Sequence, residues 1–359
     1  MATTASTAAN ADISCDEDAD DDVSKNICQA YSVGCAIMMI GAACMVLGAA
    51  MYANEKASNG LFGIGLAMLS GGLGCVASGN AQNACEEQGA DDDAIYCNSF
   101  SVASTAFFIS AGGHFIGSIL VSAGQDKPGF ALFFVGLSMY AGGYTSQAGG
   151  DSNFYCDLEE NNIIPQFDDA LKALCDGYSA SAVFHAVAMG AAGFFAVALL
   201  VASTDENKVT RRWVGWFIFF AALCIGFTAS TSGESDANCA LEEEASGSAA
   251  DTYERYCDGL SSSAVFSGIA GVVSVVAIIM AASSSMKGRN TLFMAALALF
   301  MVAFGAYYST AADESCQDAE DFDDDGLQTQ CDGQSAAAIF SMIGAAVFAV
   351  GAVVGLIAE

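Results

Sequence analysis

Residues 175–202 read CDGYSASAVFHAVAMGAAGFFAVALLVA, and this segment indicates the class of protein. After Asp176 it contains no Asp, Glu, Lys or Arg, so a long run of uncharged and mostly apolar residues follows. A helix needs about 20 predominantly apolar residues to cross the hydrocarbon core of a bilayer. The segment therefore predicts a membrane-spanning helix with a cysteine and an aspartate at its entrance.

Eight other segments resemble it in length and lack of charge. The nine predicted spans are 29–53, 60–79, 99–123, 129–148, 178–203, 213–232, 260–284, 291–311 and 334–358. Of the 359 residues 54% are hydrophobic and 14% are charged, yet the formal net charge is −31, so charge and apolar mass are segregated along the chain. This pattern excludes a soluble enzyme, and a total of 10 Lys and Arg excludes a nucleic-acid-binding protein. We predict an all-α, polytopic transmembrane helical bundle of about nine spans in a lipid bilayer.

The charged residues predict which side of the membrane each connection faces. Short connections hold seven of the 10 basic residues, namely Lys56, Lys127, Lys208, Arg211, Arg212, Lys287 and Arg289. The longer connections hold 36 of the 41 acidic residues. By the positive-inside rule the short connections are cytoplasmic. We therefore expect an extracytoplasmic N-terminus, a cytoplasmic C-terminus, and a plasma membrane or secretory-pathway membrane.

Ten of the 14 cysteines lie in the acidic connections as five pairs. The pairs are Cys15–Cys28, Cys85–Cys97, Cys156–Cys175, Cys239–Cys257 and Cys316–Cys331. One pair in each connection predicts five local disulfides, which require the oxidising side of a membrane. Closing each loop would stabilise the fold by about 3 kcal/mol. The alternative is paired thiols in a reducing compartment, but the absence of Cys-x₂-Cys spacing disfavours zinc.

The cysteine pairs also mark an internal repeat of an acidic loop, a span, a basic turn and a second span. The predicted units are residues 1–84, 85–155, 156–238, 239–315 and 316–359, and the last is a half unit with a single span. A serine follows the second cysteine of every pair by four residues, as Ser32, Ser101, Ser179, Ser261 and Ser335. Together with aspartates such as Asp176, these serines are typical of helix capping and of close helix packing in lipid. The motif predicts a duplicated hairpin and carries no indication of activity.

Small residues recur at helical spacing within the spans. Examples are Gly34, Gly41 and Gly48, Gly113 and Gly117, Ser263, Ser267 and Gly271, and Gly344, Gly351 and Gly355. Such spacing forms a groove on one helix face, so we expect a tight, largely dry bundle or close contacts between copies. His114 and His185 are the only candidates for chemistry within the spans. Either could face a pocket, but we expect each to hydrogen-bond to a neighbouring helix.

One acidic run has the spacing of a calcium-binding loop. Asp321, Asp323 and Asp325 fit the pattern D-x-D-x-D-G, and Asp332 stands at the twelfth position. An aspartate there reaches the ion less well than the usual glutamate, and Cys331 lies within the loop, so the run departs from a true EF-hand. These four aspartates are the candidate calcium ligands, and a solvated anionic surface that gathers cationic ligands is the alternative.

The sequence contains no nucleophile elbow, phosphate loop or metalloprotease helix, so we predict no enzyme and no catalytic or cofactor-binding residues. The leading hypothesis is a structural membrane protein that packs as a homo-oligomer or with partner membrane proteins. It would present an anionic, disulfide-stapled outer surface. The alternatives are a cation channel or transporter with an acidic vestibule, and an accessory subunit of a larger membrane complex.

Overall fold

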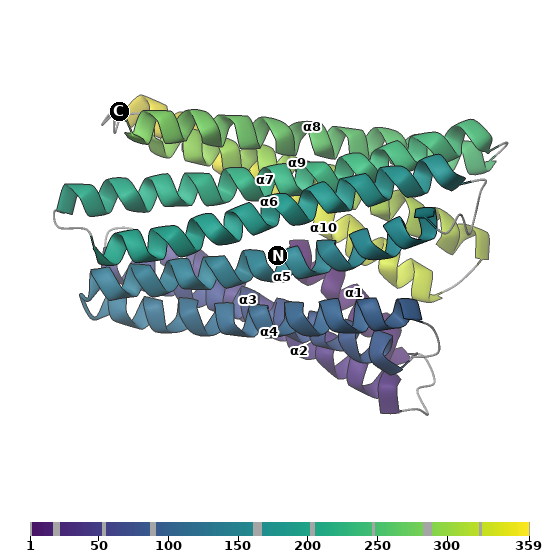
Figure 1. Cartoon of the computed structure of the whole chain (residues 1–359), viewed down its shortest axis with the longest axis horizontal. Coiled ribbons are helices and arrows are strands. Elements are labelled where there is room, and N and C mark those ends of the chain that lie inside the picture. Colours follow the sequence, from purple (N-terminus) through teal and green to yellow (C-terminus); the bar gives the residue numbers. More distant parts are fainter. Residues whose placement is uncertain are drawn as a thin grey trace.

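The computed structural model describes residues 2–16, 22–51, 55–86, 91–160, 167–201, 205–245, 248–282, 289–322 and 325–358, and every regular element in them is a helix (Figure 1). The helices are α1 (Ala2–Asp16), α2 (Asp22–Ala50), α3 (Glu55–Glu86), α4 (Asp91–Ser122), α5 (Asp126–Glu160), α6 (Asp168–Leu200), α7 (Asp205–Glu244), α8 (Ser248–Ala282), α9 (Arg289–Phe322) and α10 (Asp325–Ala358). The predicted all-α class is confirmed.

Eight of these helices, α2 to α4 and α6 to α10, are long and apolar enough to cross a membrane. The predicted span 129–148 lies in α5, which has 35 residues but is not among the eight. The second half of α5 carries polar residues such as Gln147 and Asp151, which lower its hydropathy. The structure therefore supports an integral membrane protein with eight candidate spans, and the predicted count of nine is not reached in the described residues.

Local sequence explains where helices end, as the connection between α4 and α5 shows. Gly124 has a φ of 80°, which a residue with a side chain rarely adopts, and it reverses the chain just after α4. Pro128 follows in the first turn of α5, where its missing N–H costs nothing and its fixed φ suits a helix. A short turn of this kind forces neighbouring helices to run antiparallel.

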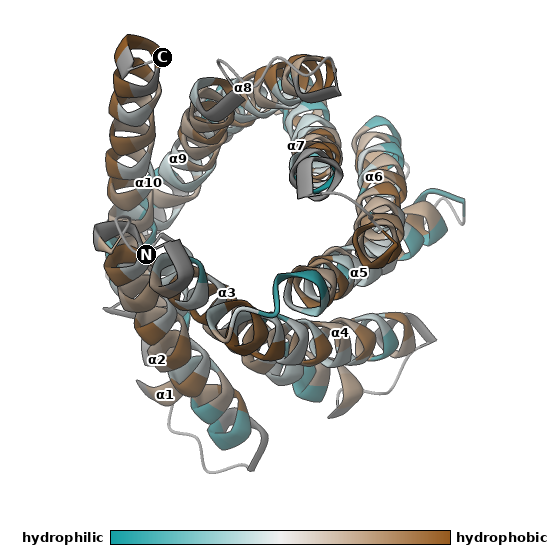
Figure 2. Ribbon diagram, turned by 90° about the vertical axis from the view of Figure 1, so that its left-hand side faces the viewer, coloured by the Kyte–Doolittle hydropathy of each residue, from teal (hydrophilic) through white to brown (hydrophobic). Residues whose placement is uncertain are grey.

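The helices form a ring (Figure 2). Each helix packs against the next one in the sequence, and α1 closes the ring by packing against both α2 and α10. The sequence gives no sign of α1, because its alternating Ala, Thr and Asn residues are not apolar enough for a span. With 15 residues it extends only about 22 Å, roughly half the length of α2.

All five predicted cysteine pairs are bonded. The bonds are Cys15–Cys28, Cys85–Cys97, Cys156–Cys175, Cys239–Cys257 and Cys316–Cys331, with Cα–Cα distances of 4.7 to 5.0 Å. Each joins the end of an odd-numbered helix to the start of the following even-numbered helix, so all five lie at one end of the bundle, called here the disulfide end. The ten helices thus form five stapled pairs, α1–α2 to α9–α10, whereas the predicted unit boundaries stay a prediction.

Glycines bring the helices into close contact, as their spacing predicts. A methyl group on Gly34 would lie 2.9 Å from the carbonyl oxygen of Gly72, and one on Gly41 would lie 2.8 Å from that of Gly65. Gly113 of α4 faces Gly136 of α5 in the same way. The backbones approach so closely that only glycine fits. Close packing of this kind stabilises helix contacts in lipid, where the hydrophobic effect does not drive helices together.

Aromatic side chains fill the half of the bundle opposite the disulfide end. Phe134 of α5 and Trp216 of α7 have ring centroids 6.1 Å apart, and Trp216 lies 6.5 Å from Phe293 of α9. Leu66 of α3 packs against the same core, and Phe134 is fully buried. Side chains from four odd-numbered helices therefore contribute to an apolar, mainly aromatic interior at this level.

Candidate functional site

A cavity of about 490 Å³ lies between the aromatic core and the disulfide end. Its lining residues come from α1, α3, α5, α6, α7 and α9. On α5 they are Tyr140, Tyr144, Gln147, Ala148 and Asp151; on α7 they are Leu223, Phe227, Ser230, Thr231 and Glu234. Steps of three and four residues place each set on one helix face. The interior of the ring thus changes from apolar rings to polar groups toward the disulfide end.

Asp151 and Glu234 are the two acidic residues among those that line the cavity. Each stands five residues before a disulfide cysteine, Cys156 and Cys239 respectively. Because α5 and α7 run in the same direction and are stapled at the same end, this equal offset brings both carboxylates to the same depth. The two carboxylates interact electrostatically across the cavity.

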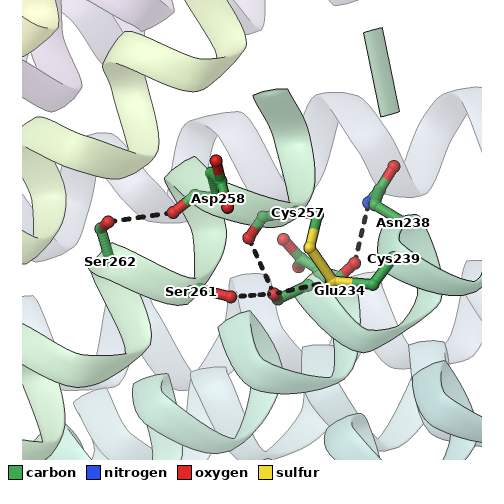
Figure 3. The surroundings of a disulfide bond; sticks show 8 residues. Glu234, Asn238, Cys239, Cys257, Asp258, Ser261 and Ser262 are labelled. Atoms are coloured by element: carbon green, nitrogen blue, oxygen red, sulfur yellow. Dashed lines mark hydrogen bonds between the residues drawn. A yellow bond between two sulfur atoms is a disulfide. The ribbon is translucent and has the colours of Figure 1, made fainter. Parts of the chain in front are cut away.

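Glu234 is held by a hydrogen bond from α6, and the Cys239–Cys257 disulfide fixes its helix nearby. The Tyr178 hydroxyl of α6 donates to Oε1 of Glu234 at 2.6 Å. On the adjoining residue, the Ser235 hydroxyl donates to the Cys257 carbonyl at 2.9 Å and lies 2.6 Å from the Ser261 hydroxyl. Figure 3 shows Glu234, Cys257 and Ser261 beside the Cys239–Cys257 disulfide. The staple and these bonds tie α7 to α8, which fixes the rotation of α7 and keeps Glu234 directed at the cavity.

Asp151 stands in a closely similar arrangement on α5. The next residue, Ser152, has its hydroxyl 2.6 Å from that of Ser179, and Cys156 bonds Cys175 beside them. Burial raises the pKa of the Asp151 carboxyl to about 6. Burial, reinforced by the negative charge of Asp151, also raises the pKa of Tyr155.

Aromatic rings form the deeper walls of the cavity. The Tyr140 and Tyr144 rings of α5 are 5.2 Å apart with their hydroxyls at 3.3 Å. Phe227 of α7 stacks on Phe304 of α9 with centroids 4.7 Å apart, and Tyr307 of α9 interacts electrostatically with Glu234. The cavity thus combines carboxylates at one end with ring faces and edges along its sides.

The two histidines have different surroundings. His114 is 1% exposed, does not line the cavity, and has Nδ1 3.4 Å from the Ser70 hydroxyl of α3, which agrees with the expected contact to a neighbouring helix. His185 lines the cavity, with its ring 5.6 Å from Tyr144 and its Nδ1 3.4 Å from Ser181 of the same helix. The hydrogen bond expected between helices is therefore within α6 for His185.

Of the candidate calcium residues, Asp332 is not among those that line the cavity. Helix α9 ends at Phe322 and helix α10 begins at Asp325, so residues 325–332 are helical and not an open loop. Asp332 is exposed and accepts a hydrogen bond from Gln328 at 3.1 Å. Asp323 lies outside the described residues, as do the side chains of Asp321 and Asp325, so calcium binding stays a prediction. Where the structure describes the chain, it gathers no group of three His, Cys, Asp or Glu side chains able to hold a metal.

Sequence reasoning missed Asp151 and Glu234. The predicted spans end at residues 148 and 232, whereas the helices continue to Glu160 and Glu244. The expectation of a tight, largely dry interior is therefore corrected toward the disulfide end, where a cavity lined by both polar and apolar side chains is present. A repeated signal marks both residues: an acid, a serine, three residues and a cysteine, as in Asp151-Ser152 to Cys156 and Glu234-Ser235 to Cys239.

No protein-family model, curated protein or solved structure matches this chain. The function must therefore be inferred from the cavity and its surroundings.

Proposed function

We propose that the protein is a cation carrier of its membrane, with the binding site in the cavity inside the helix ring. The observation that carries this is the convergence of Asp151 and Glu234 on one partly buried, ring-lined space. A carboxylate removed from water is costly unless a positive charge compensates it. No Lys or Arg is among the described residues that line the cavity. A bound cation supplies the missing charge.

The apolar half of the bundle favours a carrier over an open channel. Beyond the cavity the interior is lined by the core around Phe134 and Trp216. A cation that enters from the disulfide end therefore meets apolar rings beyond the carboxylates. Carriers bind their substrate near the middle of the membrane and open to one side at a time, whereas a channel needs a continuous path. The acidic connections at the disulfide end would attract cations toward this site.

A structural role remains the second candidate, and one surface feature favours it. A groove of about 640 Å³ runs between α9 and α10, lined by small and apolar residues such as Gly305, Ala306, Ala338 and Met342. Met342 is 52% exposed in this groove. Small residues on an outward helix face permit close approach of another helix, so a partner membrane protein or a second copy could pack there.

Cation uptake into proteoliposomes tests the carrier proposal. We expect the variant with Asp151→Asn and Glu234→Gln to lose uptake, because the cavity then offers no compensating charge. The matched control combines Glu160→Gln and Asp236→Asn, which remove two exposed acids from the same two helices. Equal uptake by the parent and the cavity variant, or loss of uptake in the control alone, would overturn the proposal.

A further inference from the structure

The dimensions and lining of the cavity bear on which kind of cation it takes, an inference that rests on the proposed function. A metal ion such as Ca²⁺ needs six to eight oxygen ligands at about 2.3–2.6 Å. The cavity has a volume of about 490 Å³, which falls in the usual range for small-molecule sites. A bare ion would leave most of this space empty.

Carboxylate ligands, which calcium sites use most, are few here: Asp151 and Glu234 are the two among the residues that line the cavity. Oε1 of Glu234 already accepts the Tyr178 hydroxyl at 2.6 Å. The Ser230 and Thr231 hydroxyls donate to the Phe227 carbonyl of their own helix at 3.1 and 2.9 Å. The remaining carboxylate oxygens suit the N–H donors of an ammonium group, which needs two or three acceptors and not a full cage.

The aromatic walls suit the body of an organic cation. On one side lie Tyr140, Tyr144 and His185, and on the other lie Phe227 and Phe304. A cation is attracted to the face of an aromatic ring, and the rings also bury apolar surface of the ligand. From Glu234 back to Phe227 is two helical turns, so a body of roughly 10 Å fits between the carboxylates and the stacked rings.

We propose that the cavity binds a protonated organic amine, with its ammonium group between Asp151 and Glu234 and its apolar body between the aromatic walls. The amine donates hydrogen bonds to the two carboxylates. Its body lies along α5 and α7 toward Phe227.

Binding of small probes to the full chain in lipid nanodiscs tests this proposal. The probes are 2-phenylethylammonium, the neutral 2-phenylethanol, and Na⁺, K⁺ and Ca²⁺, each titrated by calorimetry. We expect the amine to bind in a 1:1 ratio. The alcohol should bind at least about tenfold more weakly because it makes no charge-assisted contact with the carboxylates. The metal ions should bind at least about tenfold more weakly because they have no apolar body to place between the aromatic walls.

Variants separate the two parts of the site. Glu234→Gln should weaken amine binding about tenfold or more, and Tyr144→Leu should weaken it about threefold or more, while Tyr144→Phe keeps the ring and retains most of the affinity. Phe194→Leu, which removes a 67% exposed ring on the lipid side of α6, is the control and should change nothing.

The outcomes distinguish this inference from the proposed function. If Na⁺, K⁺ or Ca²⁺ binds in a manner that depends on Asp151 and Glu234 while the amine does not, the organic-amine proposal is wrong and cation binding stands. If neither the amine nor any metal ion binds, both proposals are wrong. Equal binding of phenylethanol and the amine would show an apolar pocket and would also contradict the amine assignment.

Discussion

Asp151 and Glu234 owe their place to a residue position that recurs around the ring. Asn80 of α3 also stands five residues before a disulfide cysteine, and it accepts a hydrogen bond from the Tyr31 hydroxyl of α2. Tyr178 donates to Glu234 in the same manner, and both tyrosines lie three residues after the second cysteine of their pair. One hydrogen bond between neighbouring helices is thus repeated with an amide acceptor and with a carboxylate. The carboxylate of this pair, Glu234, lines the cavity, whereas Asn80 is not among the residues that line it.

The carboxyl of Asp151 predicts a dependence of stability on pH. Since burial raises its pKa from 3.8 to about 6, the neutral form is favoured in the folded protein. This contribution is fully present below pH 4 and is lost as pH rises through about 6. We expect the melting temperature to fall over this range and Asp151→Asn to reduce the fall by a few degrees, measured by thermal unfolding in detergent.

The titratable groups that interact electrostatically with Asp151 are Tyr96, Tyr155, Tyr178, Glu234 and Tyr307. The control for this experiment is an acidic residue outside this group. Asp176→Asn removes an exposed carboxyl at the entrance of α6 and should leave the pH profile unchanged. A bound amine should show the opposite trend, because deprotonation of Asp151 strengthens its binding. A melting profile that Asp151→Asn does not alter would contradict the assignment.

At the scale of the element, glycine contacts hold neighbouring helices together. The contact of α2 with α3 leaves no room for a side chain at Gly41, where a methyl group would lie 2.8 Å from a backbone oxygen and 2.9 Å from Met68 Cβ. Gly112 of α4 has nothing within 4 Å of the same position. A methyl group would therefore clash at Gly41 but would meet open space at Gly112.

We expect Gly41→Ala to destabilise the protein by about 1–3 kcal/mol, because the helices must separate to admit the methyl group. Gly112→Ala should be neutral or slightly stabilising, since alanine favours a helix over glycine by about 1 kcal/mol. Thermal unfolding of both variants measures the difference. If the two melt alike, the α2–α3 contact is looser than described.

At the scale of the whole molecule, odd- and even-numbered helices differ in what their side chains face. The exposed large apolar side chains lie mainly on α2, α4, α6, α8 and α10, which therefore face lipid. The cavity is lined chiefly by odd-numbered helices, including α1, which contributes Thr3. The short helix α1 is held in the ring by Cys15–Cys28 and by Ala9, which packs against Gly333 of α10. The exposed apolar side chains thus lie mainly on even-numbered helices, whereas the cavity is lined mainly by odd-numbered helices, with three residues from α6.

Topology is the prediction that belongs to this scale. Disulfides and acidic connections should face the oxidising side, and the basic connections should face the cytoplasm. An epitope tag inserted after Ala245, between α7 and α8, should be accessible from outside on intact cells. A tag inserted after Val201, between α6 and α7, should be accessible only after permeabilisation. The reverse pattern would invert the membrane orientation and place the cavity on the cytoplasmic side.

Uncharged runs and paired cysteines were readable in the sequence because both are local signals. A run such as 178–203 is long enough for a span whatever surrounds it, and Cys239 and Cys257 are close along the chain. The close glycine contacts were also expected, because Gly34 and Gly41 share one face of a helix whatever they pack against. These features determined the helical class, the membrane setting and the five staples.

Only the tertiary structure brought Asp151 and Glu234 together, closed the ring with α1 and left a cavity beside an aromatic core. Each of these depends on which helix faces share the interior, and hydropathy averages over faces. The predicted spans 129–148 and 213–232 stop before the next acidic residue. A helix can nevertheless continue through an acidic residue whose side chain faces a cavity, as at Asp151 and Glu234. The sequence alone therefore determined what enters the membrane, and packing between helices distant along the chain decided what the interior can bind.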